Sequence, residues 1–431
     1  MTTELVPAPE STQVDTAWPR RGAPQFLSGH RVRLLQGGDE LFPAMRAAIG
    51  QARHEVWLST YIFHDDDSAR EMAIALAAAG RRGVRVGVVV DGFGSMATLP
   101  QLRQWMADPD VELAVFRPVD RWWSLLQPGQ LRRLHHKLCA VDREVAFVGG
   151  INIIGDRLDL RHGMSDVPRL DFAVELRGPV AAQVAQAARA VWSRAALGAD
   201  WREEVVALAR SAQPLARARR VLQRLRLVAS SPPMTGDAAA PVSVAFVVRD
   251  NLRRRRSIER AYIEAVLRAR ERVDLVAAYF YPGRLFRRAL IRAAQRGVRV
   301  RLLLQGKVDY RFAALAAQVL YDELRRYGVR IFEYTPAFLH AKAALVDDQW
   351  ATVGSSNIDP LSLLLNLEAN VIVRDEAFTR ELSQRFDVAV AASREVTDEA
   401  GGAGWRPLVL RGFVAWCAHW LLRMAGITSR Y

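Results

Sequence analysis

Cysteine is almost absent from this sequence of 431 residues, which contains only Cys139 and Cys417. One lies in a predicted strand and the other near the C-terminus, a pattern that favours neither a disulfide framework nor a cysteine-based zinc site, so a reducing compartment is expected. The sequence also lacks an uninterrupted apolar run of the roughly 18 to 20 residues that a membrane-spanning helix needs. Half of its residues are hydrophobic, which is enough for folded domains with their own cores.

Lysine is the other scarce residue. Of the 60 basic residues only Lys137, Lys307 and Lys342 are lysines, and all the others are arginines. The formal net charge of +14 predicts attraction to polyanions, either nucleic acid or an anionic membrane surface, and the charge alone does not choose between them. In a chain that otherwise uses arginine for positive charge, the positions of the lysines call for a specific explanation.

Two of the three lysines occupy the same place in a repeated motif. The segments 135–152 and 340–357 both read His-x-Lys, four residues, Asp, six residues, Gly, two residues, Asn. The polar members of the two copies and their glycines are His135, Lys137, Asp142, Gly149, Asn152, His340, Lys342, Asp347, Gly354 and Asn357. Chance is a poor explanation for such a match, so the two copies are interpreted as equivalent parts of one functional site.

The motif belongs to a longer repeat. Residues 55–92 and 272–306 each run as an apolar strand, an aromatic cluster, an amphipathic helix that ends in Arg-Gly, and a second apolar strand. Continuous apolar strands separated by a helix are typical of β-α-β units in a parallel sheet that is covered on both faces. The sequence therefore predicts an α/β protein of two similar halves, each a mixed, mostly parallel sheet flanked by helices.

The predicted organisation has five parts. Residues 1–27 are interpreted as a disordered lead-in, because they have neither the basic start nor the apolar run of a signal peptide. The first half with a basic helical extension occupies residues 28–228, and a linker rich in Pro, Ser and Gly occupies 229–241. The second half follows at 242–396, and the amphipathic segment 397–431 is predicted to lie in a membrane interface.

Two copies of the motif that face each other would gather two histidines, two lysines and two asparagines in one pocket. Such a pocket suits a phosphate diester, because Lys137, Lys342 and the amides of Asn152 and Asn357 can bind the nonbridging oxygens without a metal ion or a cofactor. One imidazole can attack phosphorus while the other protonates the leaving oxygen. These residues do not reveal which histidine has which role.

Each motif histidine also needs an acceptor on its other ring nitrogen to fix its tautomer. Asp171 follows the first motif and Glu368 follows the second, both at the head of a probable strand, so each carboxylate is predicted to serve the histidine of its own motif. Asp142 and Asp347 follow buried apolar runs at strand ends. These two aspartates are interpreted as structural residues, for example in salt bridges, and not as part of the chemistry.

The doubled motif resembles the phospholipase D superfamily, in which two α/β halves build one metal-independent active site that works through a phosphohistidine. Residues 88–95, 247–266, 278–283 and 354–373 are similar to bacterial cardiolipin synthases, particularly to the B-type enzymes that lack N-terminal transmembrane helices. The resemblance implies that a phosphatidyl group is transferred from a phospholipid to the hydroxyl group of phosphatidylglycerol. It also implies that His135 is the nucleophile and that His340 acts as the acid and then as the base.

Lipid is the expected partner. An anionic phospholipid membrane is predicted to bind the protein, with phosphatidylglycerol, and phosphatidylethanolamine as an alternative donor, as substrates at the cytoplasmic face of the bacterial inner membrane. Residues 120–133, with two tryptophans and flanking arginines, are interpreted as an interfacial lip. No nucleic acid is expected, because no basic and aromatic platform for stacking bases is evident. A phospholipase D-type hydrolase or a phosphodiesterase, acting on phospholipid or nucleic acid, remains the alternative.

Overall fold

The computed structural model describes most of the two predicted halves. The described residues are 23–119, 132–160, 163–209, 242–249, 255–306, 320–359 and 366–397. Lys307, the predicted linker 229–241, most of the predicted lip 120–133 and all but the first residue of the C-terminal segment 397–431 lie outside the described residues. The predictions made for those segments therefore stay predictions.

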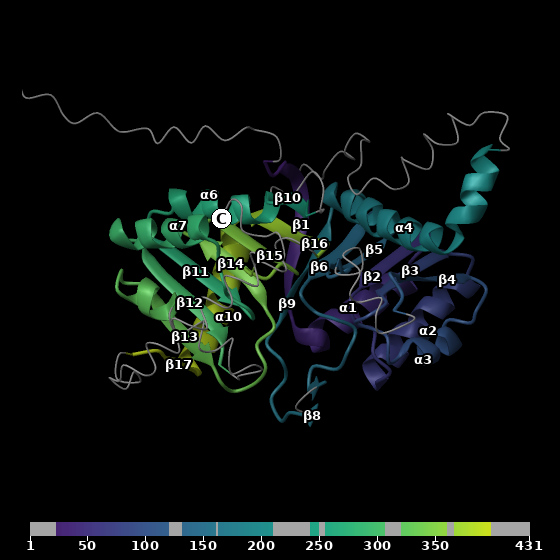
Figure 1. Cartoon of the computed structure of the whole chain (residues 1–431), viewed down its shortest axis with the longest axis horizontal. Coiled ribbons are helices and arrows are strands. Elements are labelled where there is room, and N and C mark those ends of the chain that lie inside the picture. Colours follow the sequence, from purple (N-terminus) through teal and green to yellow (C-terminus); the bar gives the residue numbers. More distant parts are fainter. Residues whose placement is uncertain are drawn as a thin grey trace, which may run out of the picture.

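The first half comprises the elements from β1 to α4. Their bounds are β1 Leu27–Gln36, α1 Gly37–Gly50, β2 Glu55–Thr60, α2 Asp67–Arg81, β3 Arg85–Asp91, α3 Leu99–Trp105, β4 Val111–Phe116, β5 Lys137–Val141, β6 Val145–Gly149, β7 Leu158–Asp159, β8 Gly163–Met164, β9 Phe172–Arg177 and α4 Val180–Ala209. In Figure 1 this half lies on the right, with the small β7–β8 hairpin below it.

The second half repeats this order from β10 to β17. Its elements are β10 Val242–Arg249, α6 Ser257–Arg268, β11 Arg272–Ala277, α7 Arg284–Gln295, β12 Arg299–Gln305, β13 Arg330–Tyr334, β14 Lys342–Val346, β15 Trp350–Gly354, β16 Glu368–Arg374, α10 Glu376–Ala391 and β17 Ser393–Glu395. The two predicted β-α-β units are therefore β2-α2-β3 and β11-α7-β12, within two similar α/β halves as predicted.

The sheet order shows the internal repeat directly. Within the described residues, fifteen strands follow the order β17-β13-β12-β11-β14-β15-β16-β10-β1-β9-β6-β5-β2-β3-β4, and the antiparallel pair of β1 and β10 joins the halves. Parallel pairing is confined to β2-β3-β4 and β11-β12-β13, whereas the other pairs are antiparallel.

The prediction of mostly parallel strands was therefore wrong. The motif strands β5 and β6 are joined by a tight turn that contains Asp142 and Arg143 in the left-handed region, and antiparallel strands alone can be joined by such a turn. Their apolar residues are buried on both faces, as in a parallel sheet, because α4 of the same half and, beside β6, strands β15 and β16 of the other half cover the face that an antiparallel sheet often exposes to water.

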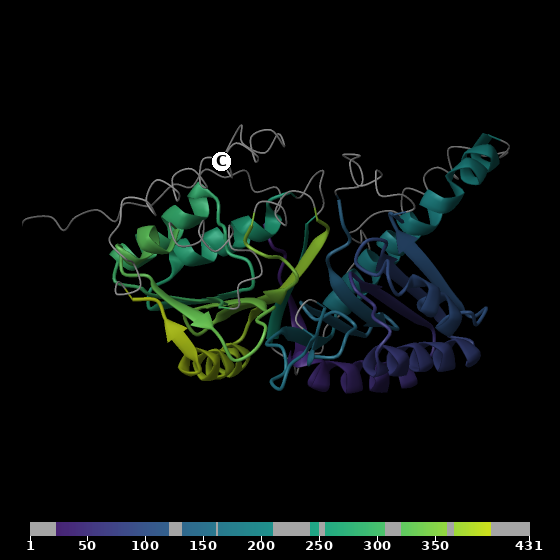
Figure 2. The ribbon, with the colours of Figure 1, turned by 60° about the horizontal axis from the view of Figure 1, so that its bottom comes forward.

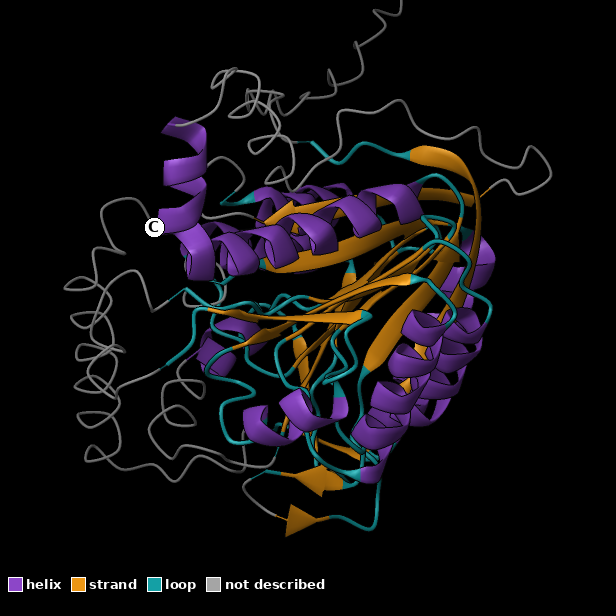
Figure 3. Ribbon diagram, turned by 90° about the vertical axis from the view of Figure 1, so that its right-hand side faces the viewer, coloured by secondary structure: helices purple, strands orange, loops and turns teal. Residues whose placement is uncertain are grey.

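In each half, helices and the other half together cover the faces of the sheet. The hydrophobic core of α1 and α2 fills one face of the first half, and that of α6 and α7 fills one face of the second. The remaining faces pack together with α4 and α10 in a single cluster that contains Val174 and Leu138 of one half and Val353 and Val371 of the other. Figure 2 shows the halves side by side, and Figure 3, viewed from the end of the first half, shows helices on both sides of the strands. The shared core fixes one half relative to the other.

Local signals in the sequence define the ends of several helices. Asp66 caps the start of α2 by accepting the amide of Ala69 at 2.9 Å, and Asp375 caps α10 in the same way. After α2 and α7, Gly83 and Gly297 adopt φ values of +84° and +87°, which glycine adopts without strain. These turns carry the chain directly into β3 and β12. Among the helices described, none is both long and apolar enough to span a membrane.

Candidate active site

The two histidine motifs lie at equivalent edges of the two half-sheets. β5 begins at Lys137, which pairs with Gly149 at the end of β6, and β14 begins at Lys342, which pairs with Ala277 at the end of β11. Because these pairs are antiparallel, the first residue of one strand lies beside the last residue of its neighbour. The motif lysines and the turns that follow the neighbouring strands are therefore close together in each half.

Each motif histidine is bonded through its backbone to the other half. Leu134 forms an isolated parallel bridge with Leu367, and there the amide of His135 donates to the carbonyl of Leu367 at 3.0 Å. The equivalent bridge involves Leu170, whose carbonyl accepts the amide of His340 at 2.9 Å. The halves thus exchange short backbone segments beside the two histidines, and the motifs are brought to one site.

The carboxylate partners of the histidines are also exchanged between the halves. His135 Nδ1 lies 3.1 Å from Oε2 of Glu368, and His340 Nδ1 lies 2.6 Å from Oδ2 of Asp171. The prediction that each carboxylate serves the histidine of its own motif was therefore wrong. The reason is the backbone exchange, because Glu368 and Asp171 directly follow the two leucines that bridge to the opposite histidine segments.

Burial and charge set the protonation of these pairs. Burial lowers the pKa of His135, and it lowers the pKa of His340 to about 3. For Asp171 and Glu368 burial acts in the opposite direction, but the histidine facing each carboxylate and the nearby lysines lower its pKa overall. Both carboxylates are therefore ionised near neutral pH. Each histidine is neutral and donates its Nδ1 proton, which leaves the lone pair on Nε2 available for chemistry.

The motif lysines are buried beside the histidines. Lys137 donates from Nζ to the carbonyl of His135 at 2.6 Å, and Lys342 donates to the carbonyl of His340. Burial lowers the pKa of both, with the positive charge of Lys342 acting on Lys137 and that of Arg169 acting on Lys342, to about 7 for Lys137 and to about 8 for Lys342. An ammonium group has three N–H donors, so a bound anion can accept from both lysines and would raise both pKa values.

The motif asparagines are buried in the turns after β6 and β15. Asn152 accepts the amide of Ile62 through Oδ1 at 3.2 Å, so its carbonyl oxygen holds the loop that follows β2. Oδ1 of Asn357 has no hydrogen-bond partner within the part of the chain that the structure describes. Phosphate binding by the two amides stays a prediction. No group of His, Cys, Asp and Glu side chains suited to a metal ion occurs among the described residues.

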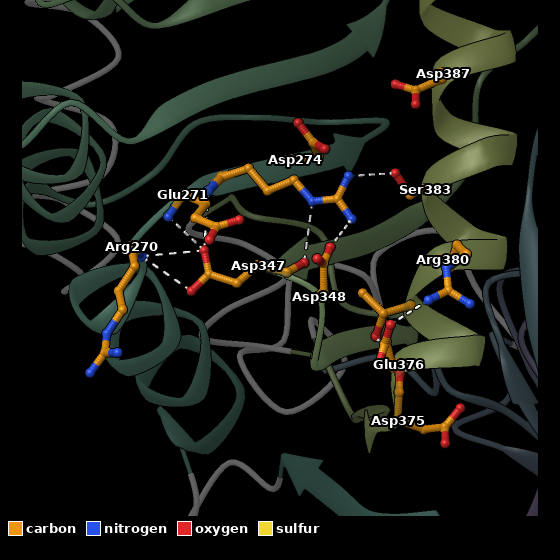
Figure 4. Close-up of polar contacts among 12 residues, drawn as sticks. Arg270, Glu271, Asp274, Asp347, Asp348, Asp375, Glu376, Arg380, Ser383 and Asp387 are labelled. Carbon is orange, nitrogen blue, oxygen red and sulfur yellow. Dashed lines mark hydrogen bonds and ion pairs between the residues drawn. The ribbon is translucent and has the colours of Figure 1, made fainter.

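Asp142 and Asp347 lie at the opposite ends of β5 and β14, away from the histidines. Each carboxylate accepts hydrogen bonds from three consecutive backbone amides, and each aspartate has a φ of +51°. The donors are Arg53, His54 and Glu55 for Asp142, and Arg270, Glu271 and Arg272 for Asp347. Figure 4 shows the second of these arrangements. Backbone amides thus take the place of the ion pairs suggested for these residues.

Tyr61 is a site residue that the sequence reasoning missed. It is the first residue after β2, and its ring centroid lies 5.2 Å from that of His135 at an angle of 58°. Lys137 Nζ lies 5.6 Å from the same ring centroid. At the equivalent position after β11 the chain has Ala278, so an alignment of the repeats reveals the difference between the halves. The aromatic contact is therefore made on the His135 side.

Ser355 marks a second difference between the halves. Its hydroxyl donates to Oε2 of Glu368 at 2.5 Å, so this carboxylate accepts from a serine as well as from a histidine. The equivalent residue after β6 is Gly150, where a Cβ atom would lie 2.4 Å from Oδ1 of Asp171. The small residue leaves room for Asp171. The two copies of the motif thus hold the carboxylates of one site in different ways.

Comparisons with known proteins point to one family. A family profile described as "Cardiolipin synthase, PLD-like domain" matches residues 45–165 and 262–389. Cardiolipin synthase B of Escherichia coli K12 is 35% identical over 374 residues, which cover 87% of this chain and 84% of that protein. Cardiolipin synthase A of Pseudomonas fluorescens SBW25 is 33% identical over 383 residues, which cover 89% and 73% of the two chains.

A solved structure with the same fold is the phosphatidylserine synthase of Haemophilus influenzae Rd KW20. It superposes with a TM-score of 0.62 at 12% sequence identity and covers 94% of this chain and 98% of its own. At this low identity the likeness concerns the fold alone.

Proposed function

The chain belongs to the family of cardiolipin synthases with phospholipase D-like domains, and we propose that it transfers a phosphatidyl group from a phospholipid donor to the hydroxyl group of phosphatidylglycerol. One observation carries this proposal. Two neutral histidines, each oriented by a carboxylate of the other half, lie beside two buried lysines at one site. This arrangement offers a nucleophile, a proton carrier and cations for one phosphate diester.

The lysines bind the substrate phosphate in the proposed mechanism. Lys137 and Lys342 donate to the nonbridging oxygens, and the amides of Asn152 and Asn357 add neutral donors. Charge that develops on these oxygens in the transition state is stabilised because the ammonium groups are fixed in advance and largely removed from water. Binding of the anionic phosphate also raises the pKa of the nearby histidines, so that one of them can carry a proton.

The first chemical step forms a covalent intermediate. His135 attacks phosphorus through Nε2, so that a P–N bond forms while the bond from phosphorus to the headgroup oxygen breaks. His340 gives its Nε2 proton to that oxygen, and the donor's headgroup leaves as an alcohol. Glu368 accepts the Nδ1 proton of His135 in a hydrogen bond and stabilises the positive charge on the ring.

In the second step the P–N bond breaks and a bond from phosphorus to the acceptor oxygen forms. His340 removes the proton from a glycerol hydroxyl group of phosphatidylglycerol, and the oxygen attacks phosphorus. The P–N bond breaks, which frees His135 and yields cardiolipin. Asp171 stabilises His340 in its protonated state, before the first step and again after the second. If water enters in place of the lipid hydroxyl, the same intermediate gives phosphatidic acid, so exclusion of water decides between transfer and hydrolysis.

The membrane setting is part of the proposal. The donor is phosphatidylglycerol or phosphatidylethanolamine, and the enzyme acts as a peripheral protein at the cytoplasmic face of the bacterial inner membrane. The formal charge of +14 favours an anionic lipid surface. The amphipathic segment 397–431 is proposed to add an apolar contact with that surface. Removal of residues 405–431 should lower cosedimentation with anionic vesicles, and unchanged cosedimentation would remove this part of the proposal.

Product analysis tests the proposed function. The purified protein is incubated with phosphatidylglycerol vesicles, with and without phosphatidylethanolamine, and the lipids are separated and identified by mass spectrometry. Cardiolipin is expected from the wild-type protein and from His54→Ala, which changes an exposed histidine outside the motifs, but not from His135→Ala. Phosphatidic acid alone would make the protein a hydrolase. The absence of any lipid product would contradict the proposal and leave nucleic acid as the substrate to test.

A further inference from the structure

Asp91 is a fully buried carboxylate that belongs to neither motif. It is the last residue of β3, and its Oδ1 accepts the amides of Phe93 at 2.9 Å and Gly94 at 3.1 Å. Its Oδ2 accepts the amide of Leu134 at 2.8 Å. The carboxylate therefore ties the turn after β3 to a chain segment more than forty residues later, and that segment leads directly into His135.

The bond to Leu134 anchors the backbone on which His135 is placed. Leu134 is the first-half member of the bridge to Leu367, and the amide of Leu367 donates to the carbonyl of Arg133 at 2.9 Å. His135 directly follows Leu134, and its partner Glu368 directly follows Leu367. A shift of Leu134 would therefore move His135 relative to its carboxylate.

The hydrogen bonds from the amides of Phe93 and Gly94 support Tyr61, whose ring is the other neighbour of His135. They fix the turn at residues 92–95, in which Ser95 donates through its hydroxyl to the carbonyl of Tyr61 at 3.1 Å. Gly94 packs so closely that a Cβ atom there would lie 2.4 Å from the same carbonyl oxygen. Tyr61 contacts the ring of His135. One carboxylate thus supports both the backbone before His135 and the aromatic ring beside it.

The second half has no such carboxylate at the equivalent place. β12 ends at Gln305, whose Nε2 donates to the carbonyl of Leu339 at 3.4 Å, just before His340. The hydrogen bond is longer and uncharged, and Ala278 stands where the first half has Tyr61. The support that Asp91 provides is therefore specific to the His135 side of the site.

We propose that Asp91 is a positioning residue for His135: its carboxylate holds the Leu134 backbone and the turn that supports Tyr61, and so keeps His135 aligned with Glu368. The inference rests on the proposed function only for its consequence in catalysis. The alignment itself is a property of the protein without substrate.

The protonation of Asp91 provides a second test of the proposal. Burial raises the pKa of Asp91 to about 6, although the amide donors and Arg133 act to lower it. Besides Arg133, the charged or titratable groups that face it are Arg117, Lys137 and Tyr61. Between pH 7.5 and 5.5 the carboxylate gains a proton, its hydrogen bonds to the amides weaken, and the alignment of His135 should loosen.

The first experiment observes the histidine rings in the free enzyme. Protein labelled with ¹⁵N in its histidine rings is compared by NMR as wild type, Asp91→Asn and Asp142→Asn, with His135 assigned from His135→Gln. Asp142→Asn is the matched control, because it also removes a carboxylate that accepts backbone amides, at the far end of β5. In Asp91→Asn the ring resonances of His135 should shift while those of His340 stay in place. Identical His135 resonances in Asp91→Asn and Asp142→Asn would overturn the proposal.

Kinetics and pH provide readouts that a purely structural role would not move. Asp91→Asn should lower kcat for lipid transfer on the order of 10²-fold, the cost of a misplaced catalytic group, with KM changed less than about twofold. In the wild-type enzyme the His135 resonances should change reversibly near pH 6, which tests the proposal even if Asp91→Asn does not fold. Absence of that change, or an unaltered kcat in folded Asp91→Asn, would overturn the inference. A wild-type protein without lipid transfer would instead overturn the proposed function, and the NMR result would still decide this one.

Discussion

Oδ2 of Asp171, in the first half of the chain, lies 2.6 Å from Nδ1 of His340, in the second half. The reciprocal pair joins His135 and Glu368, so neither half contains a complete histidine–carboxylate unit. Each half alone would have a histidine without its orienting carboxylate and a buried carboxylate without its histidine donor. The exchange makes the active site a property of the assembled pair of halves, and the bridging leucines beside it belong to the core that the halves share.

Gly150→Ala adds only one methyl group but should lower kcat strongly. The added Cβ atom would lie 2.4 Å from Oδ1 of Asp171, so the carboxylate must move away from His340. We expect kcat to fall by roughly 10²-fold or more, because His340 then loses the partner that fixes its tautomer. Gly50→Ala is the control, since nothing lies within 4 Å of a Cβ atom there. Steady-state transfer rates of the two folded variants test this expectation. Equal rates would contradict the displacement of Asp171 by the added Cβ atom.

Alkaline pH should weaken substrate binding through the motif lysines. As the pH rises through 7 and 8, Lys137 and Lys342 in the free enzyme lose their protons and with them the charge that attracts the phosphate. KM for the lipid donor should therefore rise between pH 7 and 9. The free energy of unfolding should rise over the same pH range. The folded-state pKa of each lysine lies below its unfolded value, so deprotonation removes the cost of a buried ammonium group. A KM that stays constant over this range would show that these lysines are not the titrating groups.

Asp142→Asn and Asp347→Asn should lower stability without changing the chemistry. Asparagine tolerates the left-handed backbone of both positions, so the substitution isolates the loss of the charged acceptor. We expect the free energy of unfolding to fall by about 1–3 kcal/mol for each variant, measured by denaturant titration. The transfer rate per folded molecule should equal that of the wild-type protein. A large loss of kcat in either folded variant would assign these aspartates a role in the site.

Much of the fold was predictable because the chain repeats itself. The β-α-β units follow from apolar runs separated by an amphipathic helix, and the turns at Gly83 and Gly297 end both helices as expected. The antiparallel pairing of β5 and β6 was not predicted, because burial by α4 and by the opposite half gives these strands the composition of a parallel sheet.

The members of the site were predictable, but their pairing was not. Spacing along the chain identified Asp171 and Glu368 as carboxylates near the motifs. The choice of partner depends on which backbone segments cross between the halves, and such long-range contacts leave no periodic signal in one sequence. Tyr61 and Asp91 were missed for a related reason. Neither belongs to the motif, and only packing brings them to His135.

The crossed pairing is tested most directly by trapping the covalent intermediate. A donor with a p-nitrophenyl headgroup needs no proton from His340, so Asp171→Asn should still form phosphatidyl-His135, whereas Glu368→Gln should form it far more slowly, by roughly 10²- to 10⁴-fold. The reaction is quenched within milliseconds to seconds, and the peptides that contain His135 and His340 are analysed by mass spectrometry. The account predicts label on His135 in the wild-type protein and in Asp171→Asn, with little in Glu368→Gln. Rapid labelling of His135 in Glu368→Gln together with its loss in Asp171→Asn would contradict it.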